Sequence, residues 1–298
     1  MTFKDLQKLV ESQPDHNNNP EQSKLERLRD KPFWIWDKTR HKERDRITKG
    51  ECCMQHIIGL PKKNGKEYPL FEYEKLLYKA LLEPGYLNNN PKLHSSDPNN
   101  NIMYPFKEKH IWCKKSVGLG VSEFFLRLMA WLCLYNDDYR NSQMVIVTGP
   151  NQELAIKLIK RMKGLFLEKL GVTFDSKETV LELNGCSIEA YPSNHIDAFR
   201  SLTNPKFVFL DESDYHRKNE QDDVRAVSER YIAKSDPFIV MVSTPNAPGG
   251  LFQRIEQEPF ETCIYKKFFL DYLWGVGKIY TNEEIDKAKL SPIISKRI

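Results

Sequence analysis

The hydrophobic pattern over the middle of the chain predicts strands that alternate with helices. Short runs that are apolar throughout are separated by longer segments whose apolar residues recur at helical spacing. Strands without polar alternation that are separated by helices indicate a parallel sheet covered on both faces. The fold class is therefore α/β. The expected strands are 110–113, 144–149, 207–212 and 238–244, and the expected helices are 122–134, 152–170 and 222–233.

Further elements are expected on either side of these runs. Residues 179–192 alternate around Asn184-Gly185, a pair that favours the tight turn of a β-hairpin. The pattern also predicts a helix over 73–82, ended by Pro84-Gly85. An Asn-, Pro- and Ser-rich stretch, 88–101, predicts a loop. Before residue 66 the chain is polar and irregular apart from an aromatic stretch at 32–36, which we expect to dock on the rest of the protein.

Composition narrows the class of protein. No apolar run approaches the ~20 residues of a membrane span, and the first residues do not form a signal peptide. We therefore expect a soluble, intracellular protein with no membrane partner. The formal charge of +4 does not by itself indicate nucleic-acid binding. Basic clusters at 38–46 and 157–163 are candidate contacts, although such clusters are more often solvated helix faces.

The six cysteines form no CxxC pair. Cys113 and Cys133 lie in apolar segments, where buried, reduced thiols are usual. Cys52, Cys53 and His56 offer metal-ligating groups, but adjacent cysteines lack the usual ligand spacing, so a zinc site is not expected there.

A candidate phosphate loop follows the first predicted strand. The common loop is GxxxxGK[ST], in which backbone N–H groups and a helix N-terminus bind phosphate oxygens. Here Val121 takes the place of the usual lysine, and Lys115 stands at the other end of the loop, from which its long side chain can reach back. A glycine turn capped by Ser122 is the alternative interpretation. The loop residues are Lys115, Ser116, Val117, Gly118, Leu119, Gly120, Val121 and Ser122.

Two carboxylates end the third apolar strand. Asp211 and Glu212 stand where open α/β sheets bind ligands, at the C-terminal end of a buried strand. Nucleotide hydrolysis needs one carboxylate to hold Mg²⁺ and a second to orient or deprotonate the attacking water. A solvated acidic pair at a strand end is the alternative, and the earlier phosphate loop makes it less favoured.

Two more features fit the same chemistry. The last apolar strand ends in Ser243, Thr244, Pro245 and Asn246, small polar groups that would lie beside a γ-phosphate; a simple turn is the alternative. Arg200 lies in a segment expected to be a loop beside the site. An arginine there stabilises charge on the transferred phosphoryl group, from its own subunit or from a neighbour; an exposed structural arginine is the alternative.

Together these motifs resemble the ATPase motor domain of the large terminase subunit of tailed double-stranded DNA viruses, a P-loop NTPase of the RecA/ASCE-like kind. KSVGLGVS is similar to the deviant, lysine-first Walker A loop of some terminases. The resemblance implies that Lys115 contacts the phosphates, that Ser122 and Asp211 hold Mg²⁺, and that Glu212 acts on water. It implies that residues 243–246 couple hydrolysis to movement.

The resemblance also assigns Arg200 the place of a trans-acting arginine finger. The segment 69–78 looks like the adenine-contacting segment, with Tyr73 and with Glu74 where a Gln is common. The likeness covers about residues 66–298. It implies an N-terminal accessory, helical region at 1–65, a P-loop ATPase domain at 66–265, and a lid or linker at 266–298 towards a nuclease domain that this chain lacks, whether truncated or naturally short.

The expected function is an ATP- and Mg²⁺-dependent motor that moves double-stranded DNA into a capsid. Implied partners are the portal or capsid and the small terminase subunit, with a homo-oligomeric ring as the active form in the host cytoplasm. One alternative is a helicase or remodeller, because DESD resembles a DExD box, although the chain has no room for a second RecA-like domain after residue 246. The other is a degenerate P-loop protein that binds without turnover, because Val121 replaces the lysine; Lys115 and the intact Asp211-Glu212 pair argue against it.

Overall fold

The computed structural model describes residues 62–63, 66–67, 70–82, 109–135, 137–170, 173–246, 248–277 and 279–290. The accessory region before residue 62, the aromatic stretch 32–36, the loop 88–101 and the cysteine–histidine cluster at 52–56 lie outside these residues. Within the described part of the chain, no helix is long and apolar enough to cross a membrane.

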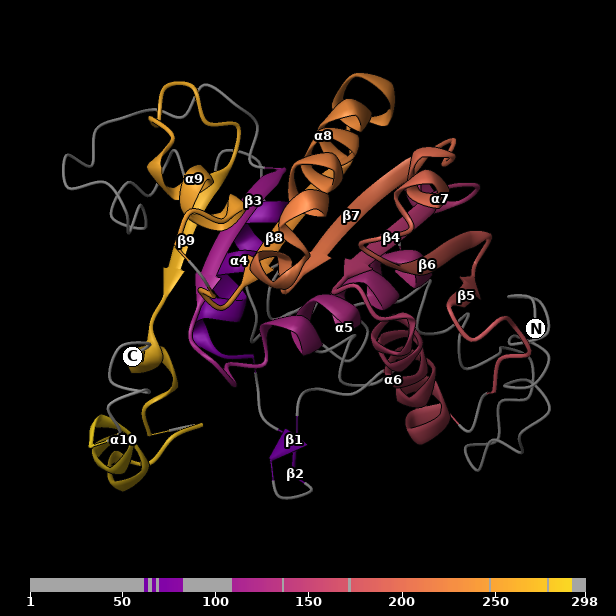
Figure 1. Ribbon diagram of the computed structural model, residues 1–298. Coiled ribbons are helices and arrows are strands. Elements are labelled where there is room, and N and C mark those ends of the chain that lie inside the picture. The colour runs from indigo at the N-terminus through magenta and orange to yellow at the C-terminus, as the bar shows by residue number, and fades with distance from the viewer. Residues whose placement is uncertain are drawn as a thin grey trace, which may run out of the picture.

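A seven-stranded sheet forms the centre of the described structure, in the order β5-β6-β4-β7-β8-β3-β9 (Figure 1). Every neighbouring pair is parallel except β5 and β6. The strands are β3 (His110–Lys115), β4 (Gln143–Thr148), β5 (Val180–Leu183), β6 (Cys186–Pro192), β7 (Pro205–Asp211), β8 (Phe238–Ser243) and β9 (Lys266–Leu270). A separate antiparallel pair is formed by β1 (Lys62–Lys63) and β2 (Lys66–Glu67).

Helices cover both faces of this sheet (Figure 1). On one face lie α4 (Glu72–Leu82), α5 (Val121–Tyr135) and α6 (Gln152–Leu170). On the other lie α7 (Ile196–Arg200), α8 (Lys218–Ser235) and α9 (Leu251–Gln257). The helix α10 (Asn282–Lys289) comes after β9, and single 3-10 turns are η2 (Asp137–Tyr139), η3 (Ser213–Tyr215) and η4 (Tyr272–Gly275).

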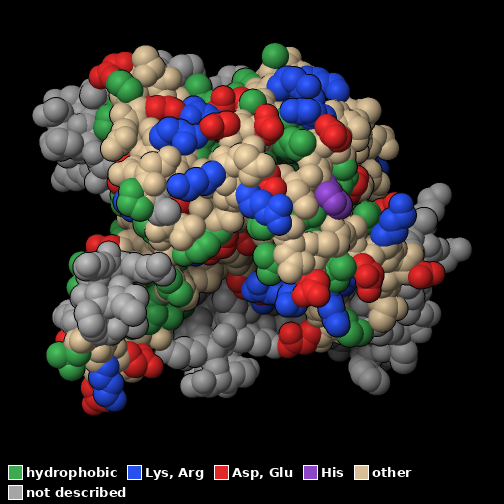
Figure 2. Space-filling model, viewed as in Figure 1, with side chains coloured by type: hydrophobic (Ala, Val, Ile, Leu, Met, Phe, Trp, Pro, Cys, Tyr) green, Lys and Arg blue, Asp and Glu red, His purple; other side chains and the backbone are tan. Residues whose placement is uncertain are grey.

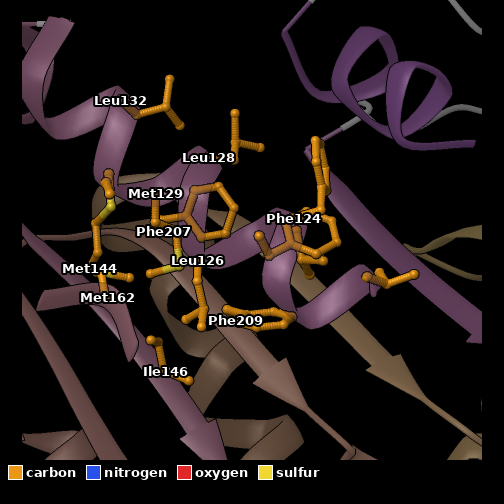
Figure 3. Packing of buried hydrophobic residues seen from close by; sticks show 14 of the residues in the cluster. Phe124, Leu126, Leu128, Met129, Leu132, Met144, Ile146, Met162, Phe207 and Phe209 are labelled. Atoms are coloured by element: carbon orange, nitrogen blue, oxygen red, sulfur yellow. The ribbon is translucent and has the colours of Figure 1, made fainter. Parts of the chain in front are cut away.

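Two hydrophobic cores follow from the alternation of side chains along each strand. Phe207 and Phe209 point to the α5 side, where Phe125 packs 5.1 Å from Phe209 between ring centroids. Figure 3 shows Phe207 and Phe209 among buried residues of α5 such as Leu126 and Met129. Trp112 points to the other side and lies 4.4 Å from Phe252 of α9 between ring centroids. Each fully buried side chain of this kind contributes about 1.5–3 kcal/mol. Strands that fill two cores at once have no polar face, which explains their unbroken apolar runs.

The strands and helices expected between residues 110 and 244 are confirmed. The hairpin is also confirmed: Asn184 and Gly185 have φ of 51° and 73°, and these two positive values are those of a type I′ turn. The expected buried thiols Cys113 and Cys133 are both free and buried.

One expectation is wrong and other elements were not predicted. The segment around residue 196, expected to be a loop, forms the short helix α7 because Phe199 is buried against Tyr231 of α8. The sequence pattern did not indicate α9, β9 or α10. β9 pairs with β3 at the sheet edge, so the sheet continues into the range 266–298 that the resemblance assigns to a lid or linker. The three-part division of the chain stays a prediction.

Candidate functional site

Three polar segments meet at one edge of the sheet because the strands before them are parallel neighbours. β8 lies between β3 and β7, and Val242 of β8 is in register with Cys113 on one side and with Asp211 on the other. The loop after β3, the acids after β7 and the polar run after β8 therefore leave the sheet side by side (Figure 1). The structure brings together the residues of these three sequence motifs.

The loop between β3 and α5 has the backbone of a tight glycine turn. Gly118 and Gly120 have φ of 79° and 74°, a left-handed conformation that favours glycine. Two tyrosine hydroxyls donate to its carbonyls: Tyr73 of α4 to the carbonyl of Leu119, and Tyr280 to the carbonyl of Val117. Carbonyls held by these donors fix the loop conformation ahead of the N-terminus of α5, where backbone N–H groups favour anions.

Lys115 ends β3 and reaches across the site. Its Nζ lies 2.7 Å from Oε1 of Glu212 and 3.1 Å from Oγ1 of Thr244, and only 6% of the side chain is exposed. The preceding Lys114 points to the opposite face of the sheet, where its Nζ lies 2.9 Å from a carboxylate oxygen of Glu256. The two lysines therefore have separate environments, and Lys115 is the one that faces the acids.

Ser122, at the start of α5, donates a hydrogen bond of 2.6 Å from Oγ to Oδ1 of Asp211. Burial raises the pKa of Asp211 to about 6; the Glu212 charge also raises it, while the Ser122 hydrogen bond and the Lys115 charge lower it. Hydroxyl and carboxylate oxygens are donors that suit Mg²⁺, and a cation there would favour the charged carboxylate.

The donor set fits a metal shared with a ligand. The described residues contain no group of three or more His, Cys, Asp or Glu side chains placed to hold an ion. Mg²⁺ usually takes one or two protein oxygens together with waters and substrate phosphates. Ser122 and Asp211 fit that arrangement.

Glu212 has a strained backbone and a well-held side chain. Its φ of 47° and ψ of 46° are left-handed, which is uncommon for a residue with a Cβ and is found more often at functional sites. Besides the contact with Lys115, its Oε2 accepts from the backbone N–H of Thr244 at 3.1 Å and from Oγ of Ser243 at 3.3 Å. Donors from β3 and β8 thus fix a carboxylate that is 36% exposed.

The polar run after β8 is joined to the segment after Glu212 through Asp214, the last residue of the DESD run. The N–H of Asp214 donates to Oγ of Ser243 at 3.1 Å, and Oδ2 of Asp214 accepts from the N–H of Asn246 at 2.6 Å. Asp214, Pro245 and Asn246 line a cavity of about 210 Å³ on the α9 side. A hydrogen-bonded chain therefore runs from Glu212 through Ser243 to the loop at 245–246.

The other residues singled out from the sequence are Arg200, Tyr73 and Glu74. Arg200 forms ion pairs within α7 and α8, at 3.3 Å to Asp197 and 3.8 Å to Asp223, and its side chain is 42% exposed. Tyr73 is fully buried, and its hydroxyl donates to the loop carbonyl of Leu119. Glu74 is also buried, and its Oε2 accepts from the N–H of Phe71 at 2.8 Å.

The spacing of the motifs gave no sign of an ion-pair cluster beside Ser122. Glu123 pairs with Arg161 of α6 and, at 2.9 Å, with Arg127 of its own helix. Arg161 also lowers the pKa of Asp211 through its charge. Glu123 and Arg161 come from different helices, so their proximity depends on how α5 and α6 pack on the sheet.

No protein-family model matches the chain, and no curated protein matches it. Among solved structures, the large terminase of bacteriophage HK97 is similar, with a TM-score of 0.52 and 13% identity over 82% of this chain and 53% of that one. The large terminase ATPase domain of a Thermus phage has a TM-score of 0.39 and 13% identity, over 55% of this chain and 74% of that one. The DEAD-box helicase Mss116 has a TM-score of 0.42 and 14% identity, over 80% of this chain and 44% of that one.

The likeness to the HK97 structure concerns the fold, and the chain spans about half of that protein. This chain's own sheet is mainly parallel and has helices on both faces. The fold class predicted from the sequence is thus confirmed: the chain has an α/β fold similar to that of the HK97 large terminase, with a mainly parallel sheet between two layers of helices.

Proposed function

We propose that the chain is the ATP-hydrolysing motor domain of a terminase large subunit, which powers the movement of double-stranded viral DNA into a capsid. The observation that carries the proposal is the meeting of Lys115, Ser122, Asp211, Glu212 and Thr244 at one sheet edge, joined by contacts of 2.6 to 3.1 Å. Their arrangement supplies the cation, the metal donors and the carboxylate that phosphoryl transfer to water requires.

In this proposal ATP lies with its phosphates on the backbone of residues 116–122, at the N-terminus of α5. The Lys115 ammonium turns from Glu212 to the β- and γ-phosphates. Its positive charge there stabilises the transition state more than the ground state. Ser122 and Asp211 hold Mg²⁺, which when bound neutralises phosphate charge. Glu212, freed from its ion pair, orients the attacking water and accepts its proton.

The same hydrogen bonds offer a route by which ATP hydrolysis would change the conformation of the coupling motif. Oε2 of Glu212 accepts from Ser243, which accepts from the N–H of Asp214, and Asp214 in turn holds Asn246. A shift of the Glu212 carboxylate would therefore displace the loop 245–246, the second half of the coupling motif at 243–246. We assign the coupling role to residues 243–246.

The wider assembly is also part of the proposal. Arg200 is exposed on α7 and would act as an arginine finger on the nucleotide of a neighbouring subunit in a homo-oligomeric ring. The partners would be double-stranded DNA, the portal or capsid, and the small terminase subunit, in the host cytoplasm. Residues 1–65 would form an accessory region, 66–265 the ATPase domain and 266–298 a lid or linker.

DNA contacts would come from local basic clusters rather than from a general positive field. Figure 2 shows Lys and Arg mixed with Asp and Glu over one face of the molecule. On α6, Lys157 and Lys160 are exposed and belong to the basic cluster 157–163. Such a cluster supplies salt-dependent, sequence-independent attraction to phosphates.

ATP hydrolysis by the full chain, measured with and without duplex DNA, single-stranded DNA and single-stranded RNA, tests the proposal. The assay covers a range of protein concentrations, because a finger in trans makes the rate per subunit rise with concentration, and Lys115→Ala is the control. Stimulation by duplex DNA that is lost in Lys115→Ala supports the motor. Stimulation by single strands together with strand separation would favour the helicase alternative, and ATP binding without turnover at any concentration would favour the degenerate binder.

A further inference from the structure

Three apolar side chains are exposed next to the phosphate loop. Val117 in the loop is 66% exposed, and Leu273 and Trp274 in η4 are 61% and 38% exposed. We call these three residues the apolar shelf. η4 lies against the loop: a Cβ at the buried Gly275 would be 3.1 Å from Cδ2 of Leu119. Large apolar side chains left in solvent beside a polar site suggest that a ligand covers them.

The shelf is built and held in place. Oδ1 of Asp271 accepts from the N–H of Leu273 at 3.0 Å and caps η4. Trp274 makes an edge contact with Tyr73, with ring centroids 6.4 Å apart, and Tyr73 donates to the carbonyl of Leu119. The next turn brings the Tyr280 hydroxyl to the carbonyl of Val117. The indole is thus joined to the loop through Tyr73, while the ring of Tyr280 packs against Gly275, the next residue.

Its position also agrees with the direction in which a nucleotide would lie. The terminal phosphate must face Glu212 and Asp211, which lie on the β8 and β7 side of β3. The nucleoside therefore leaves the loop on the other side, where β9 pairs with β3. η4 follows β9 directly, so the shelf lies on the side that the nucleoside would occupy.

We propose that Trp274, which follows the exposed Leu273 in η4, is the platform on which the base of the bound nucleotide stacks. This inference rests on the proposed function and adds the base subsite to it. Tyr73 cannot serve as the platform in this arrangement because its ring is fully buried. Stacking on an indole uses the π-face that every base has, so this contact favours a nucleoside triphosphate over inorganic polyphosphate and discriminates weakly between purines.

The test compares binding of Mg-ATP with binding of Mg-tripolyphosphate, which has the phosphates but no base. The full chain is used as wild type, Trp274→Ala and Trp274→Phe, with Leu167→Ala as a matched exposed apolar control on α6, where Leu167 is 53% exposed. Trp274→Ala should weaken ATP binding by about tenfold or more and leave tripolyphosphate binding unchanged. Trp274→Phe should restore most of the ATP affinity, and Leu167→Ala should change neither.

Two results would overturn this inference alone, in a wild type that binds both ligands. In one, Trp274→Ala weakens ATP and tripolyphosphate equally, which means that the indole only supports the loop. In the other, Trp274→Ala and Trp274→Phe leave ATP affinity unchanged, which means that the base lies elsewhere. A wild type that binds neither ligand overturns the proposed function and the base subsite with it.

Discussion

The Nζ of Lys115 lies 2.7 Å from Oε1 of Glu212, so the lysine that ends β3 is ion-paired with the acid that follows β7. The lysine is almost fully buried and the glutamate is partly exposed. A buried ammonium keeps such a contact until another anion competes for it. Phosphate oxygens of a nucleotide are such a competitor in the proposed function.

Replacing Lys115 with Ala should weaken ATP binding by about ten- to a hundredfold, because a charge-assisted contact in a partly desolvated site contributes about 1.5–3 kcal/mol. Lys114→Ala is the control, since Lys114 pairs with Glu256 on the opposite face. Nucleotide affinity and turnover of both variants check the prediction. A larger loss of ATP affinity in Lys114→Ala would mean that the wrong lysine is assigned to the phosphates. Unchanged affinity and turnover in both variants would exclude a phosphate loop that begins with its lysine.

Glu212→Gln should keep ATP binding and lower turnover by about a hundredfold or more, the usual contribution of a general base. The amide still accepts from the N–H of Thr244 but no longer takes a proton from water. Single-turnover hydrolysis and equilibrium binding, measured together, separate the two effects. A variant that hydrolyses ATP at nearly the parental rate would exclude Glu212 from this role.

The strands of the sheet, and the acids Asp211 and Glu212 at the end of one strand, could be predicted from the sequence because short, local patterns indicate them. Apolar runs predict the strands, and parallel pairing then brings their C-terminal ends together whatever lies between them. For that reason Ser122 and Asp211, far apart in the chain, form a hydrogen bond in the structure. The direction of Lys115 also follows locally, since neighbours on a strand point to opposite faces.

Other parts of the site depend on the packing of distant segments and left no local signal. Tyr280 reaches Val117 only because β9 adds to the sheet edge and the chain then turns back, and neither event has a periodic pattern. Arg161 meets Glu123 because α6 packs beside α5. The helix α7 has five residues and no side-chain cap, so burial of Phe199 rather than helix propensity decides it.

His216 should make the protein less stable as the pH falls. Burial lowers the pKa of His216 to about 4, against an opposing effect of the Asp211 backbone. Between an unfolded value of about 6.5 and a folded value near 4, the unfolded chain binds the proton and the folded chain does not. The free energy of unfolding therefore falls through this window, by at most about 1.4 kcal/mol for each pH unit.

The measurement is the difference between the unfolding free energies of wild type and His216→Gln from pH 7 to pH 4.5. The difference is needed because Asp211 acts in the opposite direction: its raised pKa, about 6, makes the folded chain the better proton acceptor below that pH. Wild type should lose stability relative to His216→Gln as the pH falls. Parallel curves would show that the imidazole is protonated equally in both states.

The final prediction concerns the Tyr280 hydroxyl, which donates to the carbonyl of Val117. Tyr280→Phe keeps the ring, whose packing requires a glycine at position 275, and removes only the hydrogen bond. One such bond contributes about 0.5–1.5 kcal/mol, so affinity for ATP should fall by roughly two- to tenfold if the bond fixes the loop for phosphates. Tripolyphosphate affinity should fall by the same factor, because the loop amides contact phosphates and not the base. Tyr272→Phe, in the same segment, is the matched control and should change neither affinity. Titrations of both ligands into the three proteins check this, and an ATP affinity that is unchanged in Tyr280→Phe would show that the loop holds its conformation without this tyrosine.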